Sequence, residues 1–294
     1  MRIPDIETYD DGRRPIKELY NQFLKLQDEG WIYEKIYTSK GIWQGKQISL
    51  PIISFRTKKE GRAFWVLSGV HGEEPAGPNA MAEGIEYVRE LGKKHSVVFI
   101  PLCNPLGYVR DWRYTDMARL SMEVEGKSVG DSEHWLLDLK NPKVPRRKKP
   151  SCLESKALTA YIVKLCKDYP PIMSIDFHED AYLNMGYVYS QGEKAEKDPI
   201  ARRVVKVLFD NGIPMKMNGK DVFGHEIYDG VIGAEKDSSM DELLATEKIY
   251  YLGKVVRKNY AQTAIVVETP VLTMPLEARA KAHLEVLKSL KDFV

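Results

Sequence analysis

The spacing of apolar residues predicts how the chain begins. Over residues 15–29, apolar side chains recur at steps of three and four, which is the period of an amphipathic helix. Two runs rich in β-forming residues follow, at residues 31–38 and 47–55. Pro51 lies within the second run and cannot donate a backbone hydrogen bond, so this strand suits a sheet edge. We therefore expect residues 1–60 to supply an N-terminal helix and edge strands.

A different pattern begins at residue 63. Residues 63–70 and 96–102 are short, nearly continuous apolar runs, and residues 79–91 between them have the pattern of a helix, which predicts a β-α-β unit with a buried parallel pair. The alternation continues with predicted helices over residues 153–169, 199–211, 240–258 and 276–293, and predicted strands over residues 172–178 and 263–269. This order indicates an α/β fold with a mostly parallel central sheet. No linker or repeat divides the chain, so residues 1–294 are expected to form one domain.

Composition narrows the classes of function. The chain has 294 residues, of which 43% are hydrophobic and 29% charged, as expected of a globular protein with a large core. Lysine plus arginine (44) against aspartate plus glutamate (42) gives a net charge of +2, which does not favour a nucleic-acid partner. Peptides and small molecules are the expected partners.

Cysteines and apolar segments indicate the compartment. Cys103, Cys152 and Cys166 cannot all pair and lack C-x-x-C spacing, which favours a reducing environment. Residues 1–20 are charged almost from the start and lack the apolar centre of a signal peptide. No segment approaches the ~20 apolar residues needed to span a bilayer. The sequence therefore predicts a cytoplasmic protein with no membrane partner.

The segment LSGVHGEEPAGPNAM, residues 67–81, carries the first candidate chemistry. His71 follows a predicted buried strand, at the carboxyl end where open α/β sheets place their sites, and Glu74 follows in a turn rich in glycine and proline. An imidazole and a carboxylate that face one point suit Zn²⁺, which in catalytic sites keeps three protein ligands and a water. A third ligand is therefore expected at the end of another core strand.

Two other predicted strands carry ionisable residues. His178 ends the run IMSIDFH and is the expected third ligand; the alternative is a core histidine bonded to the backbone. Glu268 lies in the run TAIVVETP, where an unpaired carboxylate costs several kcal/mol. A place beside a metal-bound water explains such a carboxylate, because zinc lowers the pKa of that water to about 7 and the glutamate accepts its proton. The alternative for Glu268 is a buried ion pair with an arginine.

Taken together, His71, Glu74, His178 and Glu268 resemble, in this order, the zinc carboxypeptidases of the carboxypeptidase A type. The separation of 104 positions between Glu74 and His178 fits the long insertion between the second and third ligands of that family. The resemblance covers residues 60–294. It implies a single zinc-exopeptidase-like α/β domain with helices on both faces of a mixed sheet of about eight strands. It also implies one Zn²⁺ per chain.

Two shorter motifs extend the resemblance and suggest further roles. Residues 104–107, Asn-Pro-Leu-Gly, are similar to the Asn-Pro-Asp-Gly turn of the family, and Asn104 is counted with the substrate-binding residues. An arginine shortly after that turn stabilises the oxyanion in the family, for which Arg113 is our first candidate and Arg110 our second. Residues 268–270, Glu-Thr-Pro, precede a long predicted helix, as in the family.

One segment departs from the family pattern. Family members that remove a carboxy-terminal residue hold its carboxylate with an Asn-Arg pair, whereas residues 116–119 read Asp-Met-Ala-Arg. Arg119 is retained as a substrate-binding candidate, and residues 128–135 offer replacements for the missing asparagine. Tyr250 and Tyr251 are candidates for the mobile tyrosine of the family, with Tyr251 counted among the substrate-binding residues; helix packing is the alternative role for both.

These observations leave three functions open. The first is a zinc metallocarboxypeptidase that hydrolyses a peptide bond near a free carboxylate. The second is a zinc deacylase of the aspartoacylase and succinylglutamate desuccinylase type, which acts on N-acyl amino acids. The third is a metal-free binding protein that kept the fold. The expected substrate is accordingly a peptide or an acylated amino acid.

Overall fold

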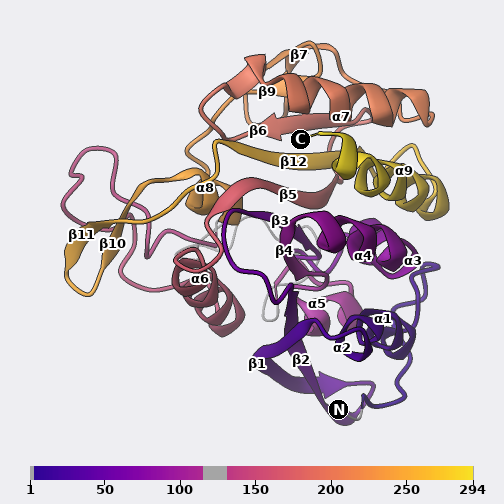
Figure 1. Ribbon diagram of the computed structural model, residues 1–294. Coiled ribbons are helices and arrows are strands. Elements are labelled where there is room, and N and C mark those ends of the chain that lie inside the picture. The colour runs from indigo at the N-terminus through magenta and orange to yellow at the C-terminus, as the bar shows by residue number, and fades with distance from the viewer. Residues whose placement is uncertain (1–2, 115–130, 294) are drawn as a thin grey trace.

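A ten-stranded sheet runs through the centre of the computed structural model, which describes residues 3–114 and 131–293 (Figure 1). From one edge to the other, the strand order is β1-β2-β4-β3-β5-β12-β6-β9-β8-β7. The strands are β1 (Ile32–Trp43), β2 (Lys46–Arg56), β3 (Ala63–Ser68), β4 (Ser96–Ile100), β5 (Pro171–Asp180), β6 (Tyr187–Ser190), β7 (Asn218–Lys220), β8 (Glu226–Tyr228), β9 (Val231–Ile232) and β12 (Thr263–Pro270). A separate two-stranded sheet pairs β10 (Lys248–Tyr251) with β11 (Lys254–Arg257).

The large sheet is mixed rather than mostly parallel, which corrects the expectation from the sequence. Four neighbouring pairs, β4-β3, β3-β5, β5-β12 and β6-β9, are parallel, and five are antiparallel. The centre, β4-β3-β5-β12, is parallel as predicted. The connection of residues 181–186 between β5 and β6 is too short for the crossover that a parallel strand requires, so β6 returns antiparallel to β12. The sequence pattern missed β6 to β9 because these strands have only two to four residues each.

Helices cover both faces of the sheet, as the family resemblance implied (Figure 1). One core contains residues of α1 (Ile16–Phe23), α2 (Lys25–Asp28), α3 (Ala76–Glu83), α4 (Ile85–Lys94), α5 (Pro105–Arg110), α7 (Pro199–Asp210) and α9 (Leu276–Ser289). The other core contains residues of α6 (Leu153–Leu165) and α8 (Met240–Ala245). Short 3₁₀ helices span Ala195–Lys197 and Leu290–Asp292. No helix in the described part of the chain combines the length and the apolar character needed to cross a membrane.

The strand that contains Pro51 lies next to the sheet edge, not at it. β1 is the outermost strand, and β2 pairs with it over its full length. On its other side, β2 pairs with β4 only at Phe55 and Arg56. Pro51, opposite Thr38 of β1, therefore occupies a stretch of β2 with a neighbour on one side only, where a missing N–H group is tolerated.

The helix predicted over residues 240–258 is wrong. The chain forms the short helix α8 and then turns through Leu252 and Gly253 into the β10-β11 hairpin. Both turn residues have positive φ, at 49° and 84°, which is the backbone of a type I′ turn and is favoured by glycine. The KIYY and KVVR sequences on either side are rich in β-branched and aromatic residues, so Gly253 was the signal that should have divided the helix.

Candidate metal centre

His71 and Glu74 are placed by the turn that joins β3 to α3. The Glu74 N–H donates to the carbonyl of His71 at 3.3 Å, so the chain reverses between them. A Cβ on Gly72 would lie 2.0 Å from the backbone carbon of Gly107, so only glycine lets this turn pack against α5. The turn brings both side chains over the end of β5.

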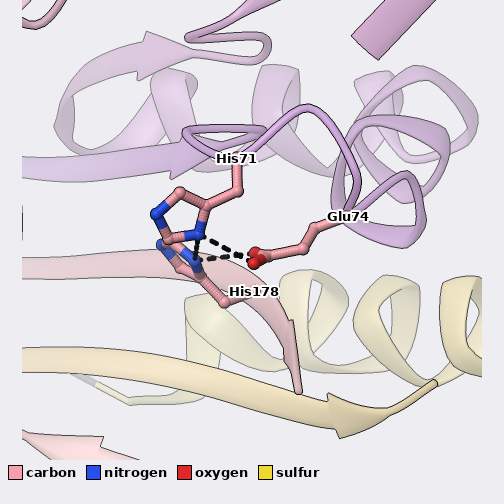
Figure 2. Close-up of side chains that lie close together, drawn as sticks. All are labelled: His71, Glu74 and His178. Atoms are coloured by element: carbon pink, nitrogen blue, oxygen red, sulfur yellow. Dashed lines mark hydrogen bonds and ion pairs between the residues drawn. The ribbon is translucent and has the colours of Figure 1, made fainter. Parts of the chain in front are cut away.

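His178 and Glu268 come from neighbouring parallel strands. His178 on β5 lies opposite Glu268 on β12, so their side chains leave the sheet on the same face. In Figure 2, His71 and Glu74 reach down from the β3-α3 connection and His178 reaches from β5, so that the three side chains point at one another. A pair of residues three positions apart and a third residue 104 positions further along the chain therefore meet at one point.

The spacing of the three side chains fits a zinc ion. Nδ1 of His71 lies 2.7 Å from Oε1 of Glu74, Nδ1 of His178 lies 2.8 Å from Oε2 of Glu74, and the two imidazole nitrogens are 3.2 Å apart. Ligands at the usual zinc distance of ~2.0–2.1 Å stand about 3.3 Å from one another in a tetrahedron, so little movement is needed. All three residues are less than 10% exposed. Two imidazoles and one carboxylate are the donor set of a catalytic site with an open position.

The pKa values of His71, Glu74 and His178 bear on whether these side chains can bind a metal ion. Burial and the nearby Arg113 lower the pKa of His71 to about 4, so this imidazole is neutral at pH 7 and keeps a lone pair for a metal. Burial opposes a low pKa at Glu74, but the two histidines outweigh it and hold the pKa well below its usual range. The pKa of His178 is well above its usual range because the carboxylates of Asp176 and Glu74 outweigh burial. A metal ion binding here would displace that proton.

Glu268 lies beside the three ligands and lines the same cavity. Within residues 3–114 and 131–293, its side chain forms no hydrogen bond or ion pair, with an arginine or any other residue. Burial, assisted by Glu74 and Asp180 and opposed by His178, raises the pKa of Glu268 well above its usual range. A glutamate with a raised pKa is suited to accept and return a proton near neutral pH.

Arg113 lies at the mouth of the ligand cluster. Its Nη1 is 3.3 Å from Oε1 of Glu73 and 3.4 Å from Oε1 of Glu74, and its guanidinium lines the cavity. Its backbone carbonyl accepts hydrogen bonds from the Asn104 side chain at 3.0 Å and from the N–H of Gly72 at 3.3 Å. The loop after α5 is thus tied to the turn that carries His71 and Glu74, which places a fixed positive charge beside the candidate metal ligands.

The other predicted substrate-binding residues are not gathered around the ligands in the described structure. Asn104 caps α5, where its Oδ1 accepts from the N–H of Gly107 at 2.9 Å. Arg110 donates to the carbonyl of Ile42 at 2.7 Å and does not line the cavity. Tyr251 belongs to β10 rather than to a helix, is 40% exposed and stacks on Trp135. Arg119 lies outside the described residues.

A cavity of about 470 Å³ extends from the metal ligands to the first turn of α8. Its wall contains nine carboxylates: Glu73, Glu74, Asp131, Asp176, Glu179, Asp180, Asp237, Asp241 and Glu268. Arg113 is the one arginine or lysine in the wall, as far as residues 3–114 and 131–293 show. Sequence reasoning missed Asp176 and Asp241, and it included Asp131 only within the range 128–135. The position of Asp176, two residues before His178 on the same strand face, was a usable signal; Asp241 comes from a remote segment and gave none.

Comparisons with known proteins agree with this geometry. No protein-family model matches the chain, and no curated protein matches it in sequence. Among solved structures, one from Shewanella amazonensis described as a "putative metallopeptidase" superposes with a TM-score of 0.69 at 19% identity, covering 93% of this chain and 92% of that one. A metallo-carboxypeptidase from Burkholderia cenocepacia gives 0.57 at 12% identity over 96% of this chain and 70% of that one.

A third match is a metallo-carboxypeptidase from Pseudomonas aeruginosa, solved in complex with (2-guanidinoethylmercapto)succinic acid, with a TM-score of 0.54 at 13% identity over 95% of this chain and 68% of that one. The chain has the fold of the metallo-carboxypeptidases. The resemblance inferred from His71, Glu74, His178 and Glu268 is therefore confirmed at the level of the fold. A metal ion is also supported, since the three predicted ligands form a buried group that could hold one.

Proposed function

We propose that the protein is a zinc-dependent metallocarboxypeptidase that hydrolyses a peptide bond near a free carboxylate. The observation that carries the proposal is the convergence of His71, Glu74 and His178 beside Glu268, inside a cavity, on a metallo-carboxypeptidase fold. Two nitrogens and a carboxylate favour zinc among the divalent ions. The three cysteines are free, which suits the cytoplasm as the place of action.

In the proposed reaction, each residue has a separate task. Zinc held by His71, Glu74 and His178 would supply Lewis-acid chemistry to the water and the scissile carbonyl. Glu268 accepts a proton from the attacking water and delivers it to the leaving amine. Arg113 keeps its charge throughout and stabilises the negative charge that develops on the carbonyl oxygen.

Carboxylate recognition is assigned to Arg119, in a segment where Ala118 replaces the asparagine of the family. Arg119 would hold the terminal carboxylate of the substrate as a ground-state contact. Its replacement by alanine should chiefly raise KM, whereas Arg113→Ala should chiefly lower kcat. This difference separates binding of the substrate from stabilisation of the transition state.

The direct test uses zinc-loaded protein and matched peptides. Elemental analysis should find about one zinc per chain, and peptides with a free carboxyl terminus should be cleaved while their carboxy-terminal amides are not. Equal cleavage of the amidated peptides would replace the exopeptidase function by an endo-acting amidase or a deacylase, which a panel of N-acyl amino acids would distinguish. Protein that binds no metal and cleaves nothing would instead be a binding protein on this fold.

A further inference from the structure

The segment before α1 reaches the candidate metal centre through one buried side chain, that of Arg13. This side chain is 0% exposed. Arg13 lies outside residues 60–294, which carry the family resemblance, so no family motif gives it a role. A buried guanidinium loses its hydration and needs acceptors for its five N–H groups. The position of those acceptors shows what the residue connects.

Two carboxylates compensate the charge of Arg13. Its Nε and Nη2 donate to the two oxygens of Asp11 at 2.8 and 2.6 Å. Nη2 also donates to Oδ1 of Asp111 at 2.5 Å. Asp111 is the residue that ends α5, with the left-handed backbone φ 59° and ψ 43°. The ion pairs therefore fix the arginine against the end of α5.

The remaining nitrogen of Arg13 is bonded to the turn that carries two of the candidate ligands. Nη1 donates to the carbonyl of Gly72 at 3.0 Å, and Gly72 lies between His71 and Glu74 in the chain. The N–H of Gly72 donates to the carbonyl of Arg113 at 3.3 Å. Both backbone polar groups of Gly72 are thus bonded, one to each arginine, which fixes the orientation of the turn.

Arg13 also connects this turn to α5. Its Nη1 donates to the carbonyl of Tyr108 as well as to that of Gly72. The chain continues from α5 through Asp111 to Arg113, the candidate for stabilising the oxyanion. One guanidinium therefore links the turn of two ligands to both ends of the segment that leads to Arg113.

From these contacts we infer that Arg13 is a positioning residue for the metal centre. Its guanidinium fixes the turn of His71 and Glu74 in the geometry that binds the ion, and fixes that turn relative to Arg113. The inference rests on the metal site of the proposed function and adds a residue to it. Ligands that are already oriented bind a metal more tightly, and catalytic groups that are held in register act faster, than groups that must be ordered first.

The alternative is a purely structural ion pair of Arg13 with Asp11 and Asp111. Such a pair requires a positive charge but not the planar fork of a guanidinium, so lysine would replace arginine in large part. Donation to two carboxylates and to two carbonyls of different elements requires several N–H groups in fixed directions, which one ammonium group does not offer. Arg13→Lys therefore distinguishes the two roles.

The test measures metal binding, which needs no substrate. Metal-free protein is titrated with Zn²⁺ in competition with a chromophoric chelator, and with Co²⁺, whose visible absorption reports the geometry of its ligands. In Arg13→Lys and in Arg13→Met, zinc affinity should fall by at least about tenfold and the cobalt spectrum should change. Urea unfolding should place Arg13→Lys closer to the natural protein than Arg13→Met, because lysine keeps the charge.

Arg56→Met is the matched control. Arg56 ends β2, pairs with Glu34 at 2.6 Å and has a side chain that is 18% exposed, but it does not line the cavity. Its replacement also removes a partly buried ion pair. Zinc affinity and the cobalt spectrum of this variant should match those of the natural protein.

Kinetics separate this inference from the proposed activity. With zinc at saturation, kcat for a cleaved peptide should fall by at least about tenfold in both Arg13 variants with a smaller change in KM, since Arg13 does not line the cavity. Natural zinc affinity and cobalt spectrum in folded Arg13→Lys would overturn the inference and leave the peptidase function intact, whatever the fate of Arg13→Met. A natural protein that binds zinc and cleaves no peptide would overturn the proposed function alone, and weaker zinc binding by Arg13→Lys would still support the role of Arg13.

Discussion

The two faces of β5 differ in chemistry although both are buried. On one face, Met173, Ile175 and Phe177 belong to the apolar core under α3 and α9. On the other face, Asp176 and His178 look into the cavity below α8. A strand with polar side chains at alternate positions gives up apolar contact on that face, so the other face must supply most of its packing.

Two buried histidines, one beside each face of β5, show the same difference in chemistry between the two faces. His178, on the polar face, has a pKa above its usual range because of Asp176 and Glu74. His283 of α9 packs against Phe177 on the apolar face, and burial there, assisted by Arg279, lowers its pKa to about 3. Burial lowers the pKa of both residues, and the two carboxylates beside His178 outweigh it, whereas no carboxylate does so at His283.

The largest effect should come from removing His178. His178→Ala should reduce bound zinc from about one per chain to near zero, because one ligand in three is lost, and should abolish activity with it. His283→Gln, on the opposite face, should keep its zinc. Elemental analysis of both proteins after gel filtration decides the matter. Full zinc in His178→Ala would remove this residue from the metal site.

Replacement of Glu268 should separate catalysis from metal binding. Glu268→Gln keeps the shape of the side chain but cannot accept a proton, so kcat should fall by a factor on the order of 10² or more while zinc stays bound. Steady-state kinetics with elemental analysis of the same sample measures both. Loss of zinc together with activity would make Glu268 a ligand instead of a base.

The sequence predicted the parallel centre and the metal side of the cavity well, for a physical reason. Buried parallel strands are nearly continuous apolar runs, and a histidine or glutamate in or directly after such a run stands out. His71, His178 and Glu268 were found in this way, and the structure brings all three together with Glu74.

The rest of the sheet and the α8 side of the cavity had no comparable signal in the sequence. The small strands β6 to β9 are too short to show a period, and the β10-β11 hairpin depends on a turn at Gly253 that the apolar pattern hides. Asp241 reaches the cavity only because α8 packs over β5 and β12, which is a tertiary contact. At Asn104, a family motif suggested substrate binding, and the structure shows a helix cap that the motif did not predict.

The burial of Asp241 predicts a measurable cost in stability. In metal-free, substrate-free protein, Asp241→Asn should raise the free energy of unfolding at pH 7 by about 1–3 kcal/mol, because it replaces a buried carboxyl group whose Oδ1 has no hydrogen-bond donor among the described residues. Loss of a negative charge in the first turn of α8 acts in the opposite direction, but by only about 0.3–1 kcal/mol. Urea unfolding of both proteins measures the difference.

The pH dependence of the stabilisation expected for Asp241→Asn tests whether the buried carboxyl group causes it. Burial and the neighbouring Asp176 raise the pKa of Asp241 well above its usual range, so at a pH between the unfolded and the folded pKa the folded state holds a proton that the unfolded state has released. This cost disappears below the unfolded pKa of about 3.9, where both states are protonated. The stabilisation by Asp241→Asn should therefore vanish by pH 3.5. A variant that is less stable at pH 7 would mean that the carboxylate already has a cationic partner.

The smallest expected effect concerns the apolar face. His283 has a folded-state pKa of about 3 and an unfolded value of about 6.5, so between these values the unfolded state binds one proton more and stability falls as the pH falls. His283→Gln, which can still reach the Thr269 hydroxyl that lies 3.0 Å from Nε2, removes this term. Between pH 6 and pH 5, the natural protein should lose about 1 kcal/mol more than the variant.

Urea unfolding of both proteins after chelation of metal measures this difference, because zinc release at low pH would otherwise add to it. The proton on His178 and the carboxylates of the polar face titrate equally in the two proteins and cancel in the comparison. Parallel stability curves from pH 7 to pH 5 would show that His283 takes up a proton without unfolding, and the contrast between the two faces of β5 would then not extend to their histidines.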